Sequence, residues 1–127
     1  MVQQDKKKAI KKIKTMIFSE KQMVDDFRKK IEAVFASPIL PNKVECKQEI
    51  IGGITCDVLL PEVYSKNRSM LYIHGGSFIG GSCASWRSFC ASIAHASCTK
   101  VILPEIRLAP KFPYPAALED AKSVIKE

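Results

Sequence analysis

A glycine-rich loop directly after a short apolar run is the feature that most restricts the fold of this chain. Residues 70–73 are Met-Leu-Tyr-Ile, and residues 74–82 are His-Gly-Gly-Ser-Phe-Ile-Gly-Gly-Ser. The apolar run is typical of a short buried strand. Consecutive glycines let the backbone turn sharply and present N–H groups with no Cβ in the way. We therefore expect a strand that ends at His74 in a loop able to bind an anion.

The segments around this loop alternate between strand and helix patterns. Gly52-Gly53 predicts a tight antiparallel hairpin of residues 44–51 and 54–60. Residues 85–96 and 115–126 are predicted helices, and the short buried strand 101–103 lies between them. This order is typical of an α/β architecture with a parallel pair of strands. We expect the strands 70–73 and 101–103 to be parallel neighbours.

The predicted hairpin has one face toward the core and one toward solvent. Alternation in its second strand places Ile54, Cys56, Val58 and Leu60 on the buried face and Thr55 and Asp57 on the other. A two-residue turn pairs Cys46 with Leu59 and Cys56 with Glu49, so the two cysteines lie on opposite faces. The five cysteines include no C-x-x-C pair and no zinc-ligand spacing. Free thiols and no metal site are the expectation.

The N-terminal segment carries most of the positive charge. The net charge of the 127 residues is +7, of which residues 1–30 contribute +6 and the remainder +1. Apolar residues recur at spacings of three and four through residues 5–36, which predicts amphipathic helix. Ser19 and Gln22 form a possible capping box, so two helices meeting near residue 19 are an alternative to one.

Three partners are open for this basic helix: a membrane surface, RNA, or the rest of the same protein. Its lysine-rich stretch, residues 5–14, contains no aromatic residue that would interleave with bases, and packing on the same protein is the simplest interpretation. Pro38 and Pro41 predict a linker. We therefore expect a basic helical segment with its linker at residues 1–42 and a second unit at residues 43–127, with membrane contact as the less favoured role and no nucleic-acid partner.

The lengths of the apolar stretches and the state of the cysteines indicate the cellular compartment. The longest apolar stretches are far shorter than the roughly 20 residues that span a bilayer. No continuous apolar run follows the N-terminal lysines, as a secretory signal would require. Together with the expected free thiols, this predicts a reducing, cytoplasmic location.

The loop can be compared with known anion-binding patterns. It contains no G-x-G-x-x-G, and although Gly76 and Gly81 have the spacing of a phosphate-binding loop, Ser82 and Cys83 stand where Lys and Ser/Thr are required. Phosphate and pyrophosphate are therefore disfavoured, and no cofactor is expected. The remaining anion is the oxyanion that develops on an attacked ester carbonyl, which backbone amides stabilise without any side chain.

Three motifs in order resemble those of the α/β-hydrolase fold, and in particular its hormone-sensitive-lipase-like branch of carboxylesterases and lipases. They are His-Gly-Gly-Ser-Phe (74–78), Arg-Leu-Ala-Pro (107–110) and Phe-Pro-Tyr-Pro-Ala-Ala-Leu-Glu-Asp-Ala (112–121). The resemblance implies that residues 43–127 form the N-terminal part of an α/β-hydrolase sheet and that residues 1–42 belong to the family's cap. It also implies an ester hydrolase.

The resemblance assigns roles to the loop residues. Gly75, Gly76 and Ser77 correspond to the family's oxyanion-hole glycines, and the amides of the last two would donate to the oxyanion. Ser77 departs from the family's glycine, and its Cβ constrains φ. We expect His74 to anchor the loop through backbone contacts rather than to act as a base.

Other residues that carry chemistry have structural interpretations. Arg107 and Asp120 are expected to form a structural ion pair, and His95 to be a surface or half-buried residue of a helix. Ser77, Ser82 and Ser85 are not nucleophile candidates, because no G-x-S-x-G is present.

The family's nucleophile elbow, triad acid and triad histidine would follow residue 127. We therefore expect a complete protein to act on a small-molecule ester and this chain alone to be inactive. The rest of the hydrolase domain would cover the open edge of strand 70–73. The alternative is a non-catalytic remnant or interaction module that binds a partner through the basic helix or that strand edge.

Overall fold

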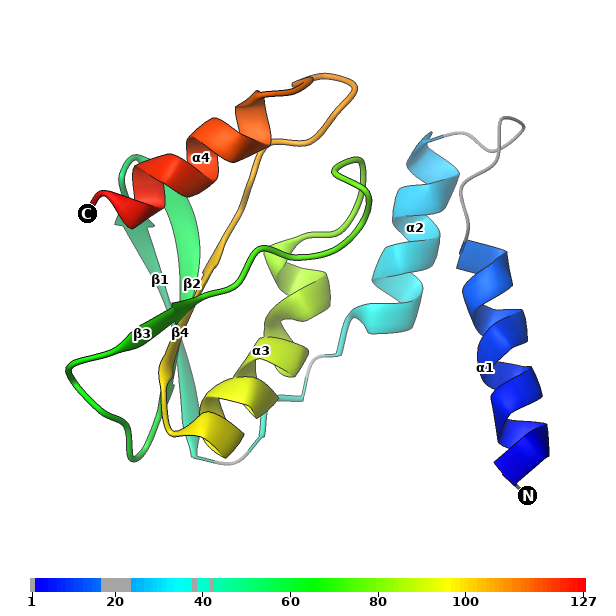
Figure 1. Ribbon diagram of the computed structural model, residues 1–127, viewed down its shortest axis with the longest axis horizontal. Coiled ribbons are helices and arrows are strands. Elements are labelled where there is room, and N and C mark those ends of the chain that lie inside the picture. The colour runs from blue at the N-terminus through cyan, green and yellow to red at the C-terminus, as the bar shows by residue number, and fades with distance from the viewer. Residues whose placement is uncertain (1, 17–23, 38, 42) are drawn as a thin grey trace.

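The computed structural model describes residues 2–16, 24–37, 39–41 and 43–127 (Figure 1). Within these residues, two N-terminal helices precede a mixed sheet of four strands and two further helices. In chain order the elements are α1 (Val2–Met16), α2 (Val24–Phe35), β1 (Val44–Ile51), β2 (Ile54–Pro61), β3 (Ser69–Leu71), α3 (Cys83–Ser97), β4 (Lys100–Pro104) and α4 (Ala116–Ile125).

The sheet has the strand order β1-β2-β4-β3. The β1–β2 hairpin is antiparallel, with Cys46 opposite Leu59 and Cys56 opposite Glu49, as the Gly-Gly turn predicts. β4 runs antiparallel to β2 and parallel to β3. The expected parallel pair is therefore confirmed. β3 is one edge of the described sheet. It ends at Leu71 rather than at the predicted residue 73, and the glycine-rich loop follows from His74.

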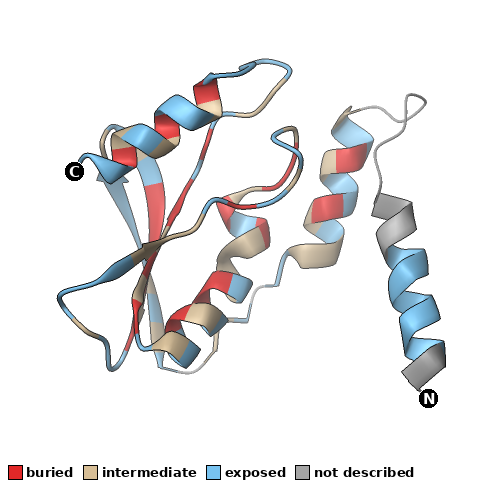
Figure 2. Cartoon of the chain, in the orientation of Figure 1, coloured by how far each residue is buried: buried red, intermediate tan, exposed pale blue. Residues whose placement is uncertain are grey.

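Helices cover both faces of the sheet, so the prediction of a solvent face on β2 is wrong. Asp57 is only 1% exposed and Leu59 is fully buried, although the predicted pattern left that face open. The chain passes from β3 to α3 on one face, and from β4 to α4 on the other, which encloses the central strand β2 (Figures 1 and 2). The core cluster under α3 comprises Leu59, Cys83, Cys90, Ala91, Ala94, Val101 and Leu103.

Helix α3 begins at Cys83, two residues before the predicted start. The Ser82 side chain accepts a hydrogen bond from the Ser85 amide, and the Ser85 hydroxyl accepts one from the Ser82 amide. This reciprocal capping box satisfies two amides that the first turn of the helix leaves without partners. The end of the glycine-rich loop is thereby fixed to the start of α3.

In the described part of the N-terminal segment, α1 covers Val2–Met16 and α2 covers Val24–Phe35. The choice between one helix and two depends on the residues between them and stays a prediction. Their junction, with Ser19 and Gln22, lies outside the described residues. Phe27 and Ile31 of α2 are buried, whereas residues 4–12 of α1 are exposed (Figure 2). None of the helices in the described ranges is long and apolar enough to cross a bilayer.

The two glycines of the hairpin turn are expected to differ in their tolerance of a side chain. Both have positive φ, but a Cβ on Gly52 would overlap the backbone carbonyl of Ser123 in α4, whereas a Cβ on Gly53 would meet nothing within 4 Å. We expect Gly53→Ala to lower the unfolding free energy by about 1 kcal/mol and Gly52→Ala by about 2–3 kcal/mol. Urea unfolding of both variants measures the difference, and equal losses would contradict the contact with α4.

Candidate anion-binding loop

The loop of residues 74–82 connects β3 to α3 through an unusual backbone path. Gly76, Ser77 and Phe78 have φ values of 136°, 55° and 59°. The Gly76 carbonyl accepts hydrogen bonds from the amides of Ile79 and Gly80, at 3.1 and 3.0 Å. The φ of Ser77 lies in the left-handed region, which glycine enters more easily than other residues. The closed turn thus accommodates a serine where the resembling family has glycine.

Two amides of this loop point outward. The carbonyl and N–H of one trans peptide point in opposite directions. The Gly75 carbonyl contacts His74 Nδ1 at 2.9 Å, so the Gly76 N–H points away from that ring. The Gly76 carbonyl is bonded inside the turn, so the Ser77 N–H points out of it. Within the described residues neither N–H has an acceptor, and the loop is exposed at Ser77.

His74 lies beneath the loop and is 6% exposed. Because a carbonyl only accepts hydrogen bonds, the contact with the Gly75 oxygen places a proton on Nδ1. Nε2 is buried and has no hydrogen-bond partner among the described residues. A Cβ on Gly81 would lie 2.8 Å from Nδ1, so the glycine there leaves room for the ring. His74 therefore contacts the loop backbone as expected of an anchoring residue, but through Nδ1 alone.

The segment between β4 and α4 lies against the loop. Asp120 is 2% exposed and accepts from the Arg107 amide at 2.8 Å, while its Oδ1 pairs with Arg107 Nη2 at 2.8 Å. The hydrogen bond to Asp120 raises the pKa of Arg107. The structural ion pair is thus confirmed, and the segment it holds donates the Ala109 amide to the Phe78 carbonyl at 2.9 Å.

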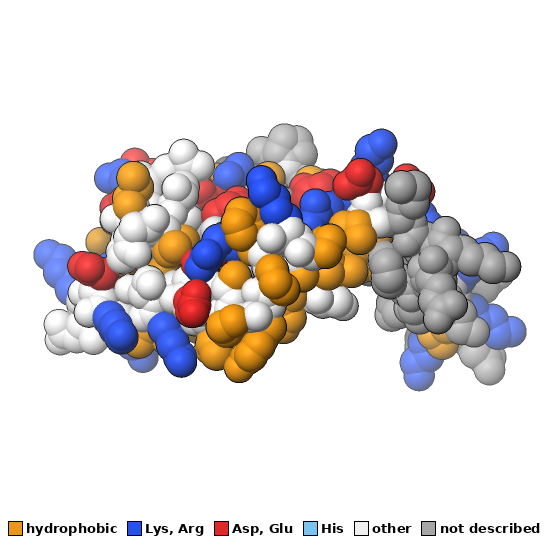
Figure 3. All heavy atoms as spheres, turned by 90° about the horizontal axis from the view of Figure 1, so that it is seen from above, with side chains coloured by type: hydrophobic (Ala, Val, Ile, Leu, Met, Phe, Trp, Pro, Cys, Tyr) orange, Lys and Arg blue, Asp and Glu red, His pale blue; other side chains and the backbone are white. Residues whose placement is uncertain are grey.

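An apolar cavity of about 450 Å³ lies beside the loop, between the segment that follows β3 and α4. Phe78, the residue after Ser77, lines it. The others are Ile73, Arg107, Ala109, Phe112, Tyr114, Ala117, Leu118 and Ala121. When the molecule is seen from above the view of Figure 1, hydrophobic side chains gather on the surface among charged ones (Figure 3). Outward amides next to an apolar cavity suit a ligand that joins a polar oxygen to an apolar group.

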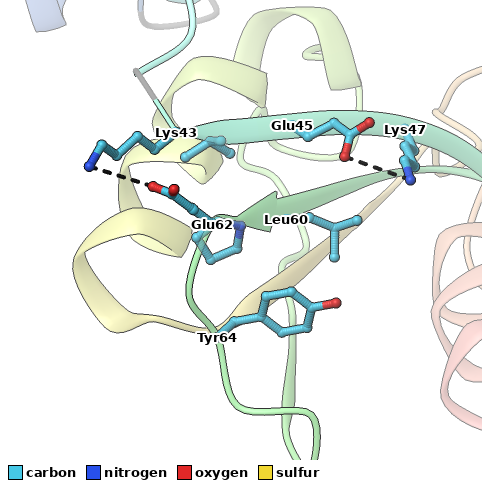
Figure 4. A pocket seen from close by; sticks show the side chains of 8 residues that line it. Lys43, Glu45, Lys47, Leu60, Glu62 and Tyr64 are labelled. Carbon is cyan, nitrogen blue, oxygen red and sulfur yellow. Dashed lines mark ion pairs between the residues drawn. The ribbon is translucent and has the colours of Figure 1, made fainter.

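A second hollow, of about 640 Å³, lies on the surface of the hairpin (Figure 4). It contains the exposed ion pairs Lys43–Glu62 at 3.5 Å and Lys47–Glu45 at 3.6 Å. Exposed pairs of this kind contribute little to stability. The hollow shares no residue with the glycine-rich loop, so it is not part of the candidate site.

The serines near the loop have structural roles. Ser82 and Ser85 cap α3, and the Ser82 hydroxyl also donates to Glu32 of α2 at 2.8 Å. His95 is exposed on α3, as expected. The contacts of α2 with the loop were not anticipated, because Arg28 and Glu32 look like ordinary surface charges in a charged helix.

The cysteines are free thiols that differ greatly in exposure. Burial raises the pKa of Cys90 to about 12 and also raises that of Cys83, whereas Cys98 is exposed. We expect iodoacetamide at pH 8 to label Cys98 rapidly and Cys83 and Cys90 only after unfolding. Because the folded-state pKa values are raised, stability should also fall as the pH rises above about 9. Rapid labelling of Cys90 in the native protein, measured by mass spectrometry, would contradict its burial.

Comparisons with known proteins converge on one group. Residues 70–127 match a family described by the alpha/beta hydrolase fold. The chain is 26% identical over 97 residues to the versiconal hemiacetal acetate esterase of Emericella nidulans, covering 76% of this chain and 34% of that protein. It is 27% identical over 84 residues to the putative acetyl-hydrolase LipR of Mycobacterium tuberculosis, covering 66% and 27%.

Solved structures give the same result over nearly the whole chain. An esterase of the bacterial hormone-sensitive lipase family superposes with a TM-score of 0.81 at 25% identity, over 94% of this chain and 40% of that one. EstE5 superposes with a TM-score of 0.81 at 29% identity, over 95% and 40%. The chain thus spans about a third or less of the two curated relatives above and about two fifths of these solved chains.

Proposed function

We propose that this chain, an α/β hydrolase of the hormone-sensitive-lipase type, supplies the oxyanion-binding loop of a carboxylic ester hydrolase. The Gly76 and Ser77 amides would hold the negatively charged oxygen of the tetrahedral intermediate, and Gly75 would provide the turn beneath them. His74 would keep the loop in place from below through the Gly75 carbonyl. The substrate would be a small-molecule ester.

The observation that carries this proposal is a pair of loop amides, those of Gly76 and Ser77, that have no acceptor among the described residues and lie near an apolar cavity. Donors fixed before the reaction act on charge that develops only in the transition state, so they lower the barrier without reorganising. The cavity beyond Phe78 would accommodate an apolar part of the ester. The esterase and acetyl-hydrolase names of the relatives support the same reaction class.

The edge of β3 fits this proposal. Among the described residues β3 pairs with β4 alone, and Ile73 just beyond it is 38% exposed. An unpaired apolar edge is a site for strand addition. We propose that the remainder of a hydrolase domain, including the nucleophile elbow and both other triad residues, covers this edge. We also propose that the nucleophile of this elbow is a serine and that the protein is cytoplasmic.

The chain alone is expected to lack esterase activity. None of its serines occupies a G-x-S-x-G, and an unassisted hydroxyl is a weak nucleophile. A fluorophosphonate probe should therefore leave the purified chain unlabelled, with an intact esterase in the same reaction as the positive control. Labelling that disappears on replacing one serine would contradict this expectation.

A sequence test addresses the whole proposal. We expect the transcript that encodes this chain to continue past the codon for Glu127 into a G-x-S-x-G some tens of residues downstream. Sequencing of full-length transcripts gives the answer. A stop codon directly after Glu127 would instead favour the non-catalytic interaction module.

A further inference from the structure

Helix α2 contacts the glycine-rich loop through successive turns of one face. Arg28 and Glu32 make polar contacts, and Phe27 and Ile31 make apolar ones (Figure 1 shows α2 beside the loop). A Cβ on Gly80 would lie 3.1 Å from both Phe27 and Ile31. The buried Gly80 is therefore packed directly beneath the helix, and its lack of a side chain permits the close approach.

Arg28 joins two loops that are far apart in the sequence. Its Nε donates to the Ile79 carbonyl at 2.7 Å, and its Nη2 donates to the Ala109 carbonyl at 3.1 Å. The Ala109 amide in turn donates to the Phe78 carbonyl. A guanidinium presents several donors in a fixed plane, so one Arg side chain can satisfy both carbonyls at once, which the single amino group of Lys does less well.

Glu32 fixes the other end of the loop. Its Oε1 accepts a hydrogen bond from the hydroxyl of Ser82, the residue that caps α3. Arg28 and Glu32 lie four residues apart and therefore face the loop together from consecutive turns. The loop is held by α2 at Ile79, at Gly80 and at Ser82.

These contacts bear on the direction of the Ser77 amide. Ile79 and Gly80 are the two residues whose amides bind the Gly76 carbonyl and so orient the peptide that joins Gly76 to Ser77. Arg28 holds the carbonyl of Ile79 itself. We propose that Arg28 is a positioning residue for the oxyanion-binding loop, supported by Glu32, so that the N-terminal segment sets the direction in which the Ser77 N–H donates. This inference rests on the proposed function of the loop.

The test measures amide hydrogen exchange on the isotope-labelled 127-residue chain by NMR. In Arg28→Ala, we expect the Ile79 and Gly80 amides to exchange at least about tenfold faster, because a charge-assisted hydrogen bond is lost, and the Ser77 amide resonance to move. Exchange at Leu59 and Val101 in the sheet should stay unchanged. Lys29→Ala, an exposed neighbour on the same helix, is the control and should leave the loop as it is.

Arg28→Lys completes the series. Lysine retains the positive charge but lacks the planar guanidinium. In Arg28→Lys the exchange rates of the loop amides should therefore lie between those of the parent and those of Arg28→Ala. Unchanged loop exchange in Arg28→Ala would overturn the proposal, as would equal acceleration in the loop and the sheet or loss of the fold in both Arg28 variants. The measurement does not depend on ester hydrolysis, so its failure is distinct from failure of the oxyanion role.

Discussion

In an ester hydrolase that contains this chain, replacing Gly76 by alanine is expected to lower kcat by about 10²–10³-fold and to leave KM nearly unchanged. Gly76 has a φ of 136°, and a Cβ there would overlap the Gly80 carbonyl. The Gly76–Ser77 peptide would therefore have to rotate, and in the proposed site this rotation would turn the Ser77 N–H away from the oxyanion. Ground-state binding is hardly affected, because the charge on that oxygen exists only in the transition state.

Ser77→Gly is the matched control for this experiment. It changes the neighbouring residue of the same turn but removes a side chain from a positive-φ position, so we expect kcat within about twofold of the parent and no loss of stability. The same overlap should lower the thermal midpoint, so kinetics on a short-chain aryl ester should be measured at a temperature at which the Gly76→Ala enzyme is fully folded. A folded Gly76→Ala enzyme with the parent's kcat would remove the oxyanion role from this loop.

The local part of this fold could be read from the sequence because it depends on local rules. A two-residue Gly-Gly turn leaves one register for the hairpin, and the observed pairing of Cys46 with Leu59 follows from it. The glycine run after an apolar strand likewise predicted where the loop would lie. The structural ion pair expected between Arg107 and Asp120 is confirmed by the contact distances.

What the sequence did not reveal depends on contacts between distant segments. Alternation along β2 could not show that α3 and α4 would cover both faces, so Asp57 was placed on an open one. Arg28 contacts carbonyls 51 and 81 residues away, and carbonyl groups carry no sequence signal. Backbone acceptors can be assigned to a side chain only when the three-dimensional path of both loops is known.

The buried carboxylate of Asp57 leads to the prediction with the largest effect on stability. Asp57 is 1% exposed, and its Oδ2 accepts a hydrogen bond from Arg87 Nε at 2.6 Å. Its Oδ1 is buried without a partner among the described residues, and the hydrogen bond raises the pKa of Arg87. Arg87→Met is expected to lower the unfolding free energy by about 3–5 kcal/mol, because it leaves a buried charge without compensation.

The double variant Asp57→Leu/Arg87→Met separates the cost of an unpaired charge from the loss of the pair itself. Replacing both partners by apolar side chains removes the buried charge, so we expect it to recover most of the stability lost in Arg87→Met. Urea unfolding of the parent, Arg87→Met and the double variant gives the three free energies. Arg87→Met within about 1 kcal/mol of the parent would mean that solvent reaches Asp57, and a double variant no more stable than Arg87→Met would mean that packing of the Arg87 side chain, rather than its charge, holds α3 to the sheet.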